Sequence, residues 1–261
     1  MHDSPTIYVF GLSVDLSNVL MIVVASVIVF VLAVIGTRKL SVENPGKLQN
    51  FMEWIVEFVS NLIASTMDMK KGKAFIMLGI TLIMYIFVAN MLGLPFAITT
   101  IHEEPFELFG TEIISQEYLN ELEAKKGYAE AHILWWKSPT ASLGPTMALA
   151  LLVITLSHYL GITRNTKHYF KHYFQPSPLF FPIHVIEQAS KLLTIGMRLF
   201  GNIFAGEMLI AVILMASYWG IVPLMAWQGF SVFIGAIQAF VFTILTMVYI
   251  GQSITHEENH G

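Results

Sequence analysis

The sequence predicts an all-α integral membrane protein with about five membrane-crossing helices and one amphipathic helix at the membrane interface. The composition is one reason: 55% of the 261 residues are hydrophobic and 12% are charged, whereas about a quarter of the residues in a soluble domain are charged. Apolar runs of about 20 residues, enough to cross a hydrocarbon core of about 30 Å, recur along the chain. Long unbroken runs favour helices over barrel strands, and in lipid only these two structures satisfy the backbone.

Five runs are long enough to span a membrane. The N-terminus before the first run has no Lys or Arg, so it lacks the basic region of a secretory signal and we expect the run to be retained. From the apolar residues alone, the expected spans cover residues 19–36, 74–93, 143–162, 192–217 and 229–250.

The Lys and Arg residues predict which side of the membrane each loop faces. They gather after the first and the third run, whereas the loop between the second and third runs, residues 98–142, holds three Lys and eight Glu. Cytoplasmic loops carry the excess of Lys and Arg. We therefore expect the basic loops and the C-terminus in the cytoplasm, and the N-terminus and the acidic loop outside. Within that loop, Ile113–Lys126 is expected to form a short exposed helix.

Residues 48–69 differ from the spans because one face is apolar and the other polar. Phe51, Ile55, Phe58 and Leu62 recur at helical spacing. This pattern predicts an amphipathic helix in the cytoplasmic interface. Packing against the other spans is an alternative, and the two interpretations are compatible.

Two charges fall within apolar runs, and both predict an ion path. Arg198 lies in the fourth run, where an Arg at the bilayer centre costs roughly 2.5–3.5 kcal/mol on insertion scales. Arginine keeps its proton, so Arg198 can act only as a fixed positive charge. Glu207 can carry a proton, and it lies half a turn away from Arg198 in azimuth, about 13 Å further along a straight helix. The alternatives are internal pairing of either residue, or an Arg198 side chain that reaches the interface.

Further polar residues share the helix of Arg198. Glu187, Lys191 and Asn202 fall near the Arg198 side of that helix, and Glu187 and Lys191 have the favourable i, i+4 order. Apart from Glu187, we find no carboxyl on this side at membrane depth, so the carboxyl that meets Arg198 is expected to come from another chain. Gln238 in the last run is either a helix-to-helix hydrogen-bonding residue or part of the path.

The histidines and the absent motifs narrow the function further. His158 and His184 are candidate proton relays, although ordinary hydrogen-bonded helix histidines are the stronger interpretation. His168 and His172 are spaced for a metal, but no carboxylate lies beside them. The sequence contains no phosphate loop, nucleotide fingerprint or nucleophile–base pair. We therefore expect no cofactor, no metal, no nucleic-acid partner and no catalytic activity of the chain itself.

Five motifs resemble subunit a of F-type ATP synthases, in its Bacillus-type branch. The most specific is residues 195–207, IGMRLFGNIFAGE, followed by residues 237–249, IQAFVFTILTMVY. Residues 51–54, FMEW, residues 88–95, VANMLGLP, and residues 135–140, WWKSPT, add support. The resemblance covers nearly the whole chain except about residues 101–132.

The resemblance implies a fold and partners. Two long tilted helices, about 178–217 and 222–251, would pack against the rotating ring of c subunits. The b subunits of the peripheral stalk and membrane lipid would be further partners, and the F1 sector an indirect one. The chain would lie in a bacterial plasma membrane.

The resemblance also implies roles for named residues. Arg198 would separate two aqueous half-channels and displace the proton from each passing c-subunit carboxylate. Glu207 would be the acid of the outer half-channel, and Asn90 would lie in the same half-channel. Gln238 and Asn202 would lie near the arginine.

The sequence departs from the family pattern at two positions. Ser231 stands where some members have a histidine paired with the acid, and Gly93 stands where some have an aspartate. Two functions of other classes remain open at this stage: a secondary transporter with a mid-membrane ion site, and a structural scaffold. A transporter is expected to have two related halves with broken helices, and we find no internal repeat.

Overall fold

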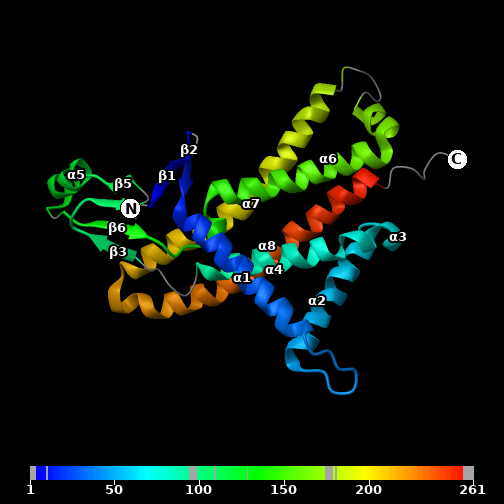
Figure 1. Ribbon diagram of the computed structural model, residues 1–261, viewed down its shortest axis with the longest axis horizontal. Helices are drawn as coiled ribbons and strands as arrows, with labels where there is room; N and C mark the ends of the chain where they lie inside the picture. The colour runs from blue at the N-terminus through cyan, green and yellow to red at the C-terminus, as the bar shows by residue number, and fades with distance from the viewer. Residues whose placement is uncertain are drawn as a thin grey trace.

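Five long apolar helices form the body of the protein (Figure 1), as the sequence predicts. The computed structural model describes residues 4–254 except 10, 94–98, 109, 128, 174–178 and 180. The side chains of His168 and His172 are not among those described, and neither is the acidic C-terminal tail. The helices that can cross a membrane are Leu16–Thr37 (α1), Met69–Leu92, Leu143–Arg164, Phe181–Leu214 (α7) and Ile221–Ile254 (α8). This is the architecture of a multi-pass membrane protein.

The second and third spans belong to longer helical segments than their apolar runs. The second is built from three consecutive pieces, α3 (Met69–Gly72), η1 (Lys73–Phe75) and α4 (Ile76–Leu92). The third is the first part of α6, which continues to Tyr173. Hydropathy alone places the start of the second span and the end of the third span inside the helices, because these two helix ends carry Lys and Arg.

The helix α2 (Lys47–Ala64) packs against the other helices, which was the alternative interpretation of the amphipathic segment, whereas its place in the membrane interface stays a prediction. Its buried side chains include Met52, Val59 and Ile63, and it contacts α1, α4 and α8. Trp54, in contrast, is 59% exposed. The helix ends at Ala64, before the predicted limit of 69, because Asp68 caps the next helix by accepting a hydrogen bond from the Lys70 backbone N–H at 2.9 Å.

The core lies where α4, α6 and α8 meet. Buried side chains at this junction include Ile86, Val153 and Phe242. Leu199 of α7 packs into the same cluster with no exposed surface. Gly196 permits this close approach of α7 to α6, because a Cβ there would collide with the side chain of Met147.

The helices α7 and α8 are long and unequally covered. Each has 34 residues, which corresponds to about 51 Å against a hydrocarbon core of about 30 Å. Helices of this length must tilt or extend beyond the hydrocarbon. Only 6% of the apolar window of α7 is buried, compared with 39% for α8. Most of the α7 surface is therefore left without a partner from the described chain.

A small α/β region lies at the end of the molecule where α1 begins (Figure 1). It contains three antiparallel pairs, β1–β2, β3–β6 and β4–β5, together with α5. The elements are Thr6–Val9 (β1), Leu12–Asp15 (β2), Thr99–His102 (β3), Phe106–Leu108 (β4), Thr111–Ile114 (β5), Gln116–Lys126 (α5) and Ala131–Leu134 (β6).

Most of this region comes from the segment expected to be an acidic loop, and it has a hydrophobic cluster of its own. Ile114, Leu119 and Ile133 are almost completely buried in that cluster. The predicted helix over Ile113–Lys126 exists but begins later, at Gln116. Ile113 and Ile114 belong to β5, and the Ser115 hydroxyl caps the helix by accepting a hydrogen bond from the Tyr118 N–H at 3.1 Å.

Candidate functional site

Arg198 lies on the uncovered surface of α7. Its side chain is exposed, and the neighbouring Met197 is 48% exposed. Within the described part of the chain, no hydrogen bond or ion pair involves the Arg198 guanidinium. The sequence alternative that pairs Arg198 internally therefore finds no support among the described residues. A guanidinium in apolar surroundings is expected to meet an anion or water, so the geometry leaves this charge available to a partner.

Asn202, one helical turn after Arg198, joins α7 to α8. Its side-chain amide donates a hydrogen bond of 2.8 Å to Gln238 Oε1. Gln238 is 3% exposed, so this hydrogen bond satisfies a buried polar group that would otherwise be costly in the interior. Asn202 and Gln238 are thus in contact, with Gln238 buried and Arg198 exposed, while the proximity of Gln238 to Arg198 itself stays a prediction.

Asn90, near the end of α4, is the buried polar centre of a second contact. Its side-chain amide donates to the Gly235 carbonyl of α8 at 3.0 Å, and its Oδ1 accepts a hydrogen bond from Thr140 Oγ1 at 2.7 Å. Thr140 belongs to η2 (Pro139–Ala141). Gly235 allows α8 this close approach, since a Cβ there would lie 3.3 Å from the Asn90 Cβ and against Met91.

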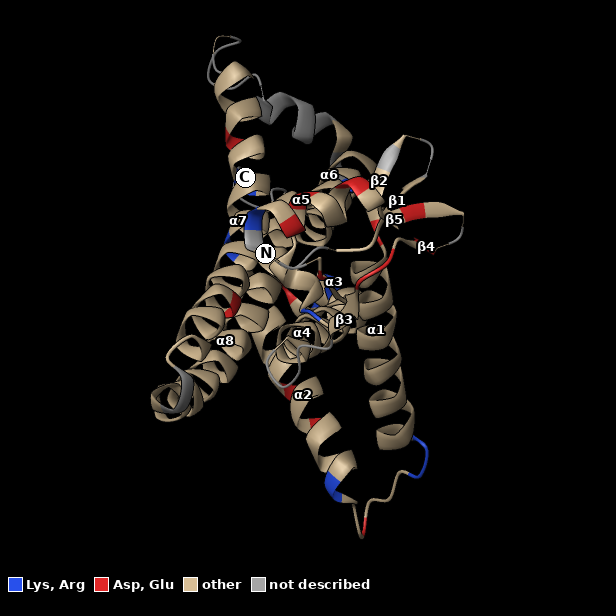
Figure 2. Cartoon of the chain, turned by 90° about the vertical axis from the view of Figure 1, so that its left-hand side faces the viewer, with Lys and Arg blue, Asp and Glu red and all other residues tan. Residues whose placement is uncertain are grey.

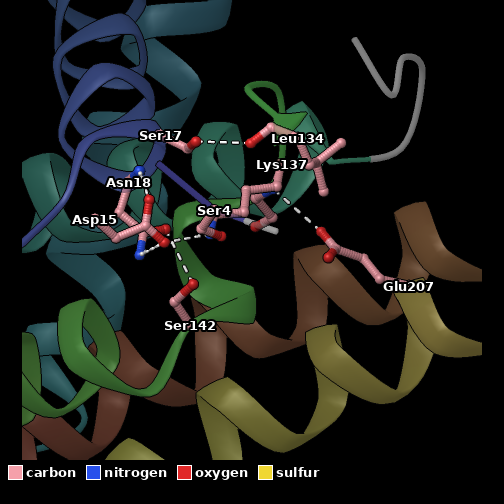
Figure 3. A network of polar contacts seen from close by, with 9 residues as sticks. Ser4, Asp15, Ser17, Asn18, Leu134, Lys137, Ser142 and Glu207 are labelled. Carbon is pink, nitrogen blue, oxygen red and sulfur yellow. Dashed lines mark hydrogen bonds and ion pairs between the residues drawn. The ribbon is translucent and has the colours of Figure 1, made fainter. Parts of the chain in front are cut away.

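Glu207 points toward the segment before α6 that contains Lys137 (Figure 3), and its carboxyl group lies beside Gly93 at the end of α4. The backbone N–H of Ser138 donates a hydrogen bond of 3.1 Å to Glu207 Oε1. Gly93 leaves space for this carboxyl group, because a Cβ at Gly93 would collide with Glu207 Oε1 and lie 2.8 Å from the Ser138 Cβ. The side chain therefore occupies a defined position and does not lie free in lipid.

A cavity of about 440 Å³ joins Glu207 to three of the other predicted polar residues. Trp227 and Phe230 supply aromatic walls, and Asn90, Asn202, Glu207 and Ser231 supply polar groups. The Ser231 Oγ is buried, and it has no hydrogen-bond partner among the described residues. An unpaired buried hydroxyl on the wall of a roomy cavity that also holds amide and carboxyl groups is a typical position for ordered water. The cavity can therefore hold a hydrated path between Glu207 and the vicinity of Asn202.

A separate polar cluster lies nearer the start of α7. Glu187 forms an ion pair with Lys191 at 2.9 Å, and its Oε2 lies 3.6 Å from His184 Nδ1. The Lys191 ammonium also lies 5.5 Å from the centre of the Tyr249 ring of α8. The Glu187 and Lys191 charges thus neutralise each other, and neither forms an ion pair with Arg198.

The predicted residues thus fall into three groups. Asn90, Asn202, Glu207 and Ser231 share the cavity, with Gln238 hydrogen-bonded to Asn202 behind its lining. Arg198 is on the exposed face, and His184 and Lys191 are in the separate cluster. The Nδ1 of His158, another relay candidate, lies 2.8 Å from the Ile154 carbonyl. Within the described residues, no group of three or more His, Cys, Asp or Glu is arranged to hold a metal.

The sequence analysis missed the segment that contacts Glu207. The sequence analysis named this segment only as the motif at residues 135–140, and it predicted no role for Lys137, Ser138 or Thr140. One local signal was available: a Ser followed by Pro is typical of a helix start, and Ser138 does cap η2. That signal predicts a turn, but it does not indicate which side chains the turn will meet.

Comparison with known proteins identifies one family along nearly the whole chain. The model of the family described as ATP synthase A chain matches residues 19–251. The ATP synthase subunit a of Bacillus velezensis is 47% identical over 272 aligned residues, which cover 98% of this chain and 99% of the relative. The subunit a of Bacillus subtilis is 46% identical with the same coverage. That of Anoxybacillus flavithermus is 47% identical over 264 residues, again covering 98% and 99%.

Proposed function

This chain belongs to the ATP synthase A chain family, and from that premise we propose that it is the stationary proton-channel subunit of an F-type ATP synthase. In this role it has no catalytic activity of its own. It supplies two half-channels and the arginine that drives proton exchange with the carboxylates of a rotating c ring. The observation that carries the proposal is the exposed Arg198 on one side of α7 with Glu207 in a polar cavity on the other.

The exposed Arg198 supports exchange with a carboxyl of another chain. The guanidinium does not release a proton, but a nearby positive charge favours the ionised form of a carboxyl group. Arg198 has no carboxylate partner among the described residues, and Glu187 is engaged by Lys191. A c-subunit carboxyl that approaches the α7 surface would therefore lose its proton opposite Arg198. A transporter with its own ion site would instead be expected to hold the counter-charge within the chain.

The cavity supports the outer half-channel. Glu207 would take a proton from the outer side and pass it, through water near Ser231 and Asn202, to a ring carboxyl on one side of Arg198. Ser231 replaces the histidine of some family members, and its unpaired hydroxyl supports transfer through water.

The cluster of His184, Glu187 and Lys191, close to Tyr249, supports an inner half-channel on the opposite side of Arg198. This arrangement requires the start of α7 to face the cytoplasm. It agrees with an outer N-terminus, since Asp and Glu gather around α5, β4 and β5 whereas Lys and Arg occupy the loop that joins α1 to α2 (Figure 2). Basic loops remain on the cytoplasmic side.

The uncovered surface fits the partners that this role requires. The c ring would contact the exposed side of α7 and α8, the b subunits and lipid would cover other helices, and the F1 sector would be reached indirectly. A bacterial plasma membrane is the corresponding location.

The deciding experiment replaces the cation in the assembled complex. In membranes that hold the full ATP synthase, Arg198→Ala is expected to abolish ATP-driven proton pumping while the complex still assembles. Arg198→Lys is also expected to fail, because an ammonium is a flexible point charge and loses its proton more readily when buried. Arg38→Ala removes an exposed arginine at the end of α1 and is the matched control. Coupled pumping at the wild-type rate by Arg198→Ala would refute the proposal.

A further inference from the structure

A buried ion pair connects the start of α1 to the residue that precedes Ser138 (Figure 3). The Lys137 ammonium lies 2.5 Å from Asp15 Oδ2 and donates a hydrogen bond of 2.7 Å to Ser4 Oγ. The side chains are only 11% and 19% exposed, for Lys137 and Asp15 respectively. Because unpaired charges are expensive to bury, each of these two residues depends on the other.

The same end of α1 is tied to this segment at two further points. The Ser17 hydroxyl donates to the Leu134 carbonyl at 2.7 Å, and the Ser142 hydroxyl donates to Asn18 Oδ1 at 2.9 Å. Residues 134–142, which we call the connector, are therefore fixed to α1 near their beginning, middle and end.

The opposite side of the connector is fixed to the end of α4. Trp136 Nε1 donates to the Leu92 carbonyl at 2.7 Å, and the Ser138 hydroxyl donates to the Ala89 carbonyl at 2.8 Å. The Ser138 N–H remains free for Glu207, to which it donates the hydrogen bond of 3.1 Å. The hydrogen bond to Glu207 thus comes from the peptide group that joins Lys137 to Ser138.

We propose that the Asp15–Lys137 ion pair is a positioning device for Glu207, which holds the 137–138 peptide group against the carboxyl group and balances the charge beside it. The inference rests on the proposed role of Glu207 as the outer proton carrier. Neither Asp15 nor Lys137 relays the proton. Their contribution is to fix the hydrogen-bond donor and to set the electric field in which Glu207 takes up and releases its proton.

The charges around Glu207 make the inference specific. Lys137 is the charged side chain that acts electrostatically on this carboxyl group. Among the described residues, α4 presents Asn90 and Gly93 to the cavity, and α8 presents uncharged side chains such as Trp227 and Ser231. Asp15 neutralises the Lys137 ammonium through their ion pair. Removal of one member of the pair therefore leaves an uncompensated charge whose sign depends on which member is removed.

The test uses ATP synthesis by the complete complex in proteoliposomes, measured against the pH on the side of the strands and α5. In Lys137→Met, the remaining Asp15 carboxylate favours the protonated form of Glu207. The profile of synthesis rate against this pH is therefore expected to move to higher pH. In Asp15→Asn, the remaining ammonium favours the ionised form, so the profile is expected to move to lower pH. A neighbouring unit charge changes such equilibria by on the order of one pH unit.

Rescue variants distinguish an electrostatic effect of the Asp15–Lys137 pair on Glu207 from a purely structural role of the pair. The double variant Asp15→Asn/Lys137→Met is expected to return the profile to near the wild-type position, and Lys137→Arg is expected to keep it there. The exposed pair Glu121–Lys125 on α5 is the control, because its side chains are 57% and 72% exposed and the charges are screened. Glu121→Gln and Lys125→Met should leave the profile in place.

Displacement of both single-variant profiles in the same direction, or a loss of rate without displacement, would overturn the inference. Either result would assign the pair a structural role alone. Glu207→Gln tests the premise separately: if it conducts protons normally, the proposed function fails. If Glu207→Gln is defective while Asp15→Asn and Lys137→Met leave the profile unmoved, only the positioning role fails. Immunoblots of subunit content distinguish these results from failed assembly.

Discussion

Arg198 and Glu207 are nine positions apart on one helix, and this spacing turns their side chains to opposite sides. The structure confirms the prediction: Arg198 is exposed, whereas Glu207 reaches the connector and the cavity. The separation matters chemically because an arginine in direct contact with Glu207 would hold that carboxyl group in its ionised form. Because they lie on opposite sides, Arg198 and Glu207 can act on a third group in sequence, as the proposed function requires.

Adding one methyl group at Gly93 tests whether the Glu207 carboxyl group must lie beside Ser138. In Gly93→Ala, the new Cβ would collide with Glu207 Oε1 and would lie 3.0 Å from the Ser138 N. Overpacking of this kind costs about 1–3 kcal/mol, and displacement of the carboxyl group is its simplest relief. We expect passive proton conduction through the membrane sector to fall about ten-fold or more, since about 1.4 kcal/mol corresponds to a factor of ten.

The control for this prediction is Gly144→Ala, where a Cβ would meet nothing within 4 Å. Both variants should assemble into the complex in similar amounts. Unchanged conduction by Gly93→Ala would mean that the Glu207 carboxyl group does not need its position beside Ser138.

At the scale of elements, α7 is unusual because one long helix has two different sides. Ile195 and Leu199 are packed against the core, whereas Thr194 and Arg198, spaced i and i+4, are exposed. Soluble proteins rarely leave such a long apolar face uncovered. In a membrane, lipid or a second subunit covers it, and the cation on this face favours a subunit that brings a carboxyl group.

Cysteine cross-linking tests which partner covers this face. The chain contains no Cys, so single replacements have no background. We expect Thr194→Cys to form a disulfide with a cysteine placed one turn from the carboxyl-bearing residue of the c subunit. Ala150→Cys, at a fully buried α6 position, should form none. If an active complex shows no Thr194 cross-link, the c ring contacts another face of the protein and the prediction is wrong.

The elements that could be predicted from the sequence were those with a long apolar signal. Leu16–Thr37 begins three residues before and ends one residue after the expected run 19–36, whereas Ile221–Ile254 begins eight residues before and ends four residues after the expected run 229–250. The first eleven residues of α7 could not be predicted from hydropathy because His184 and Glu187 interrupt the apolar pattern, and this part of the helix was expected only from the family resemblance. The strands β3 and β6 are short and pair across 35 positions at Thr99 and Leu134, a distance that local patterns do not encode.

The same limit applies to the site. Arg198 and Glu207 could be recognised because a charge in an apolar run is expensive wherever the helix packs. Lys137 could not, because it lies in a polar loop and resembles an interfacial residue until its partner is known. That partner, Asp15, is 122 positions away. Long-range ion pairs depend on how the helices pack, and a single sequence contains no direct record of that packing.

At the scale of the whole molecule, the polar structure is divided between two ends. The strands and α5 lie where α1 begins, while α3 and the end of α8 lie at the opposite end (Figure 1). The connector belongs to the first end and holds Glu207, whereas the cluster of Glu187 and Lys191 lies toward the start of α7. Under the proposed function, these two polar regions would be the entrances on either side of Arg198, and they would have to stay separate because a continuous channel would dissipate the gradient.

The arrangement of the two ends predicts the topology of the chain in the membrane. Glu117 lies on α5 and Lys70 on α3, and both side chains are exposed. Single cysteines at these positions, Glu117→Cys and Lys70→Cys, should react with a membrane-impermeant maleimide from opposite sides. Glu117→Cys should be labelled in intact cells and Lys70→Cys only in inverted vesicles, because loops rich in Lys remain in the cytoplasm. Ala150→Cys, buried between helices, should not be labelled in either preparation. Labelling of Glu117→Cys and Lys70→Cys from one side would contradict an odd number of crossings between them and the end-to-end separation of the two half-channels.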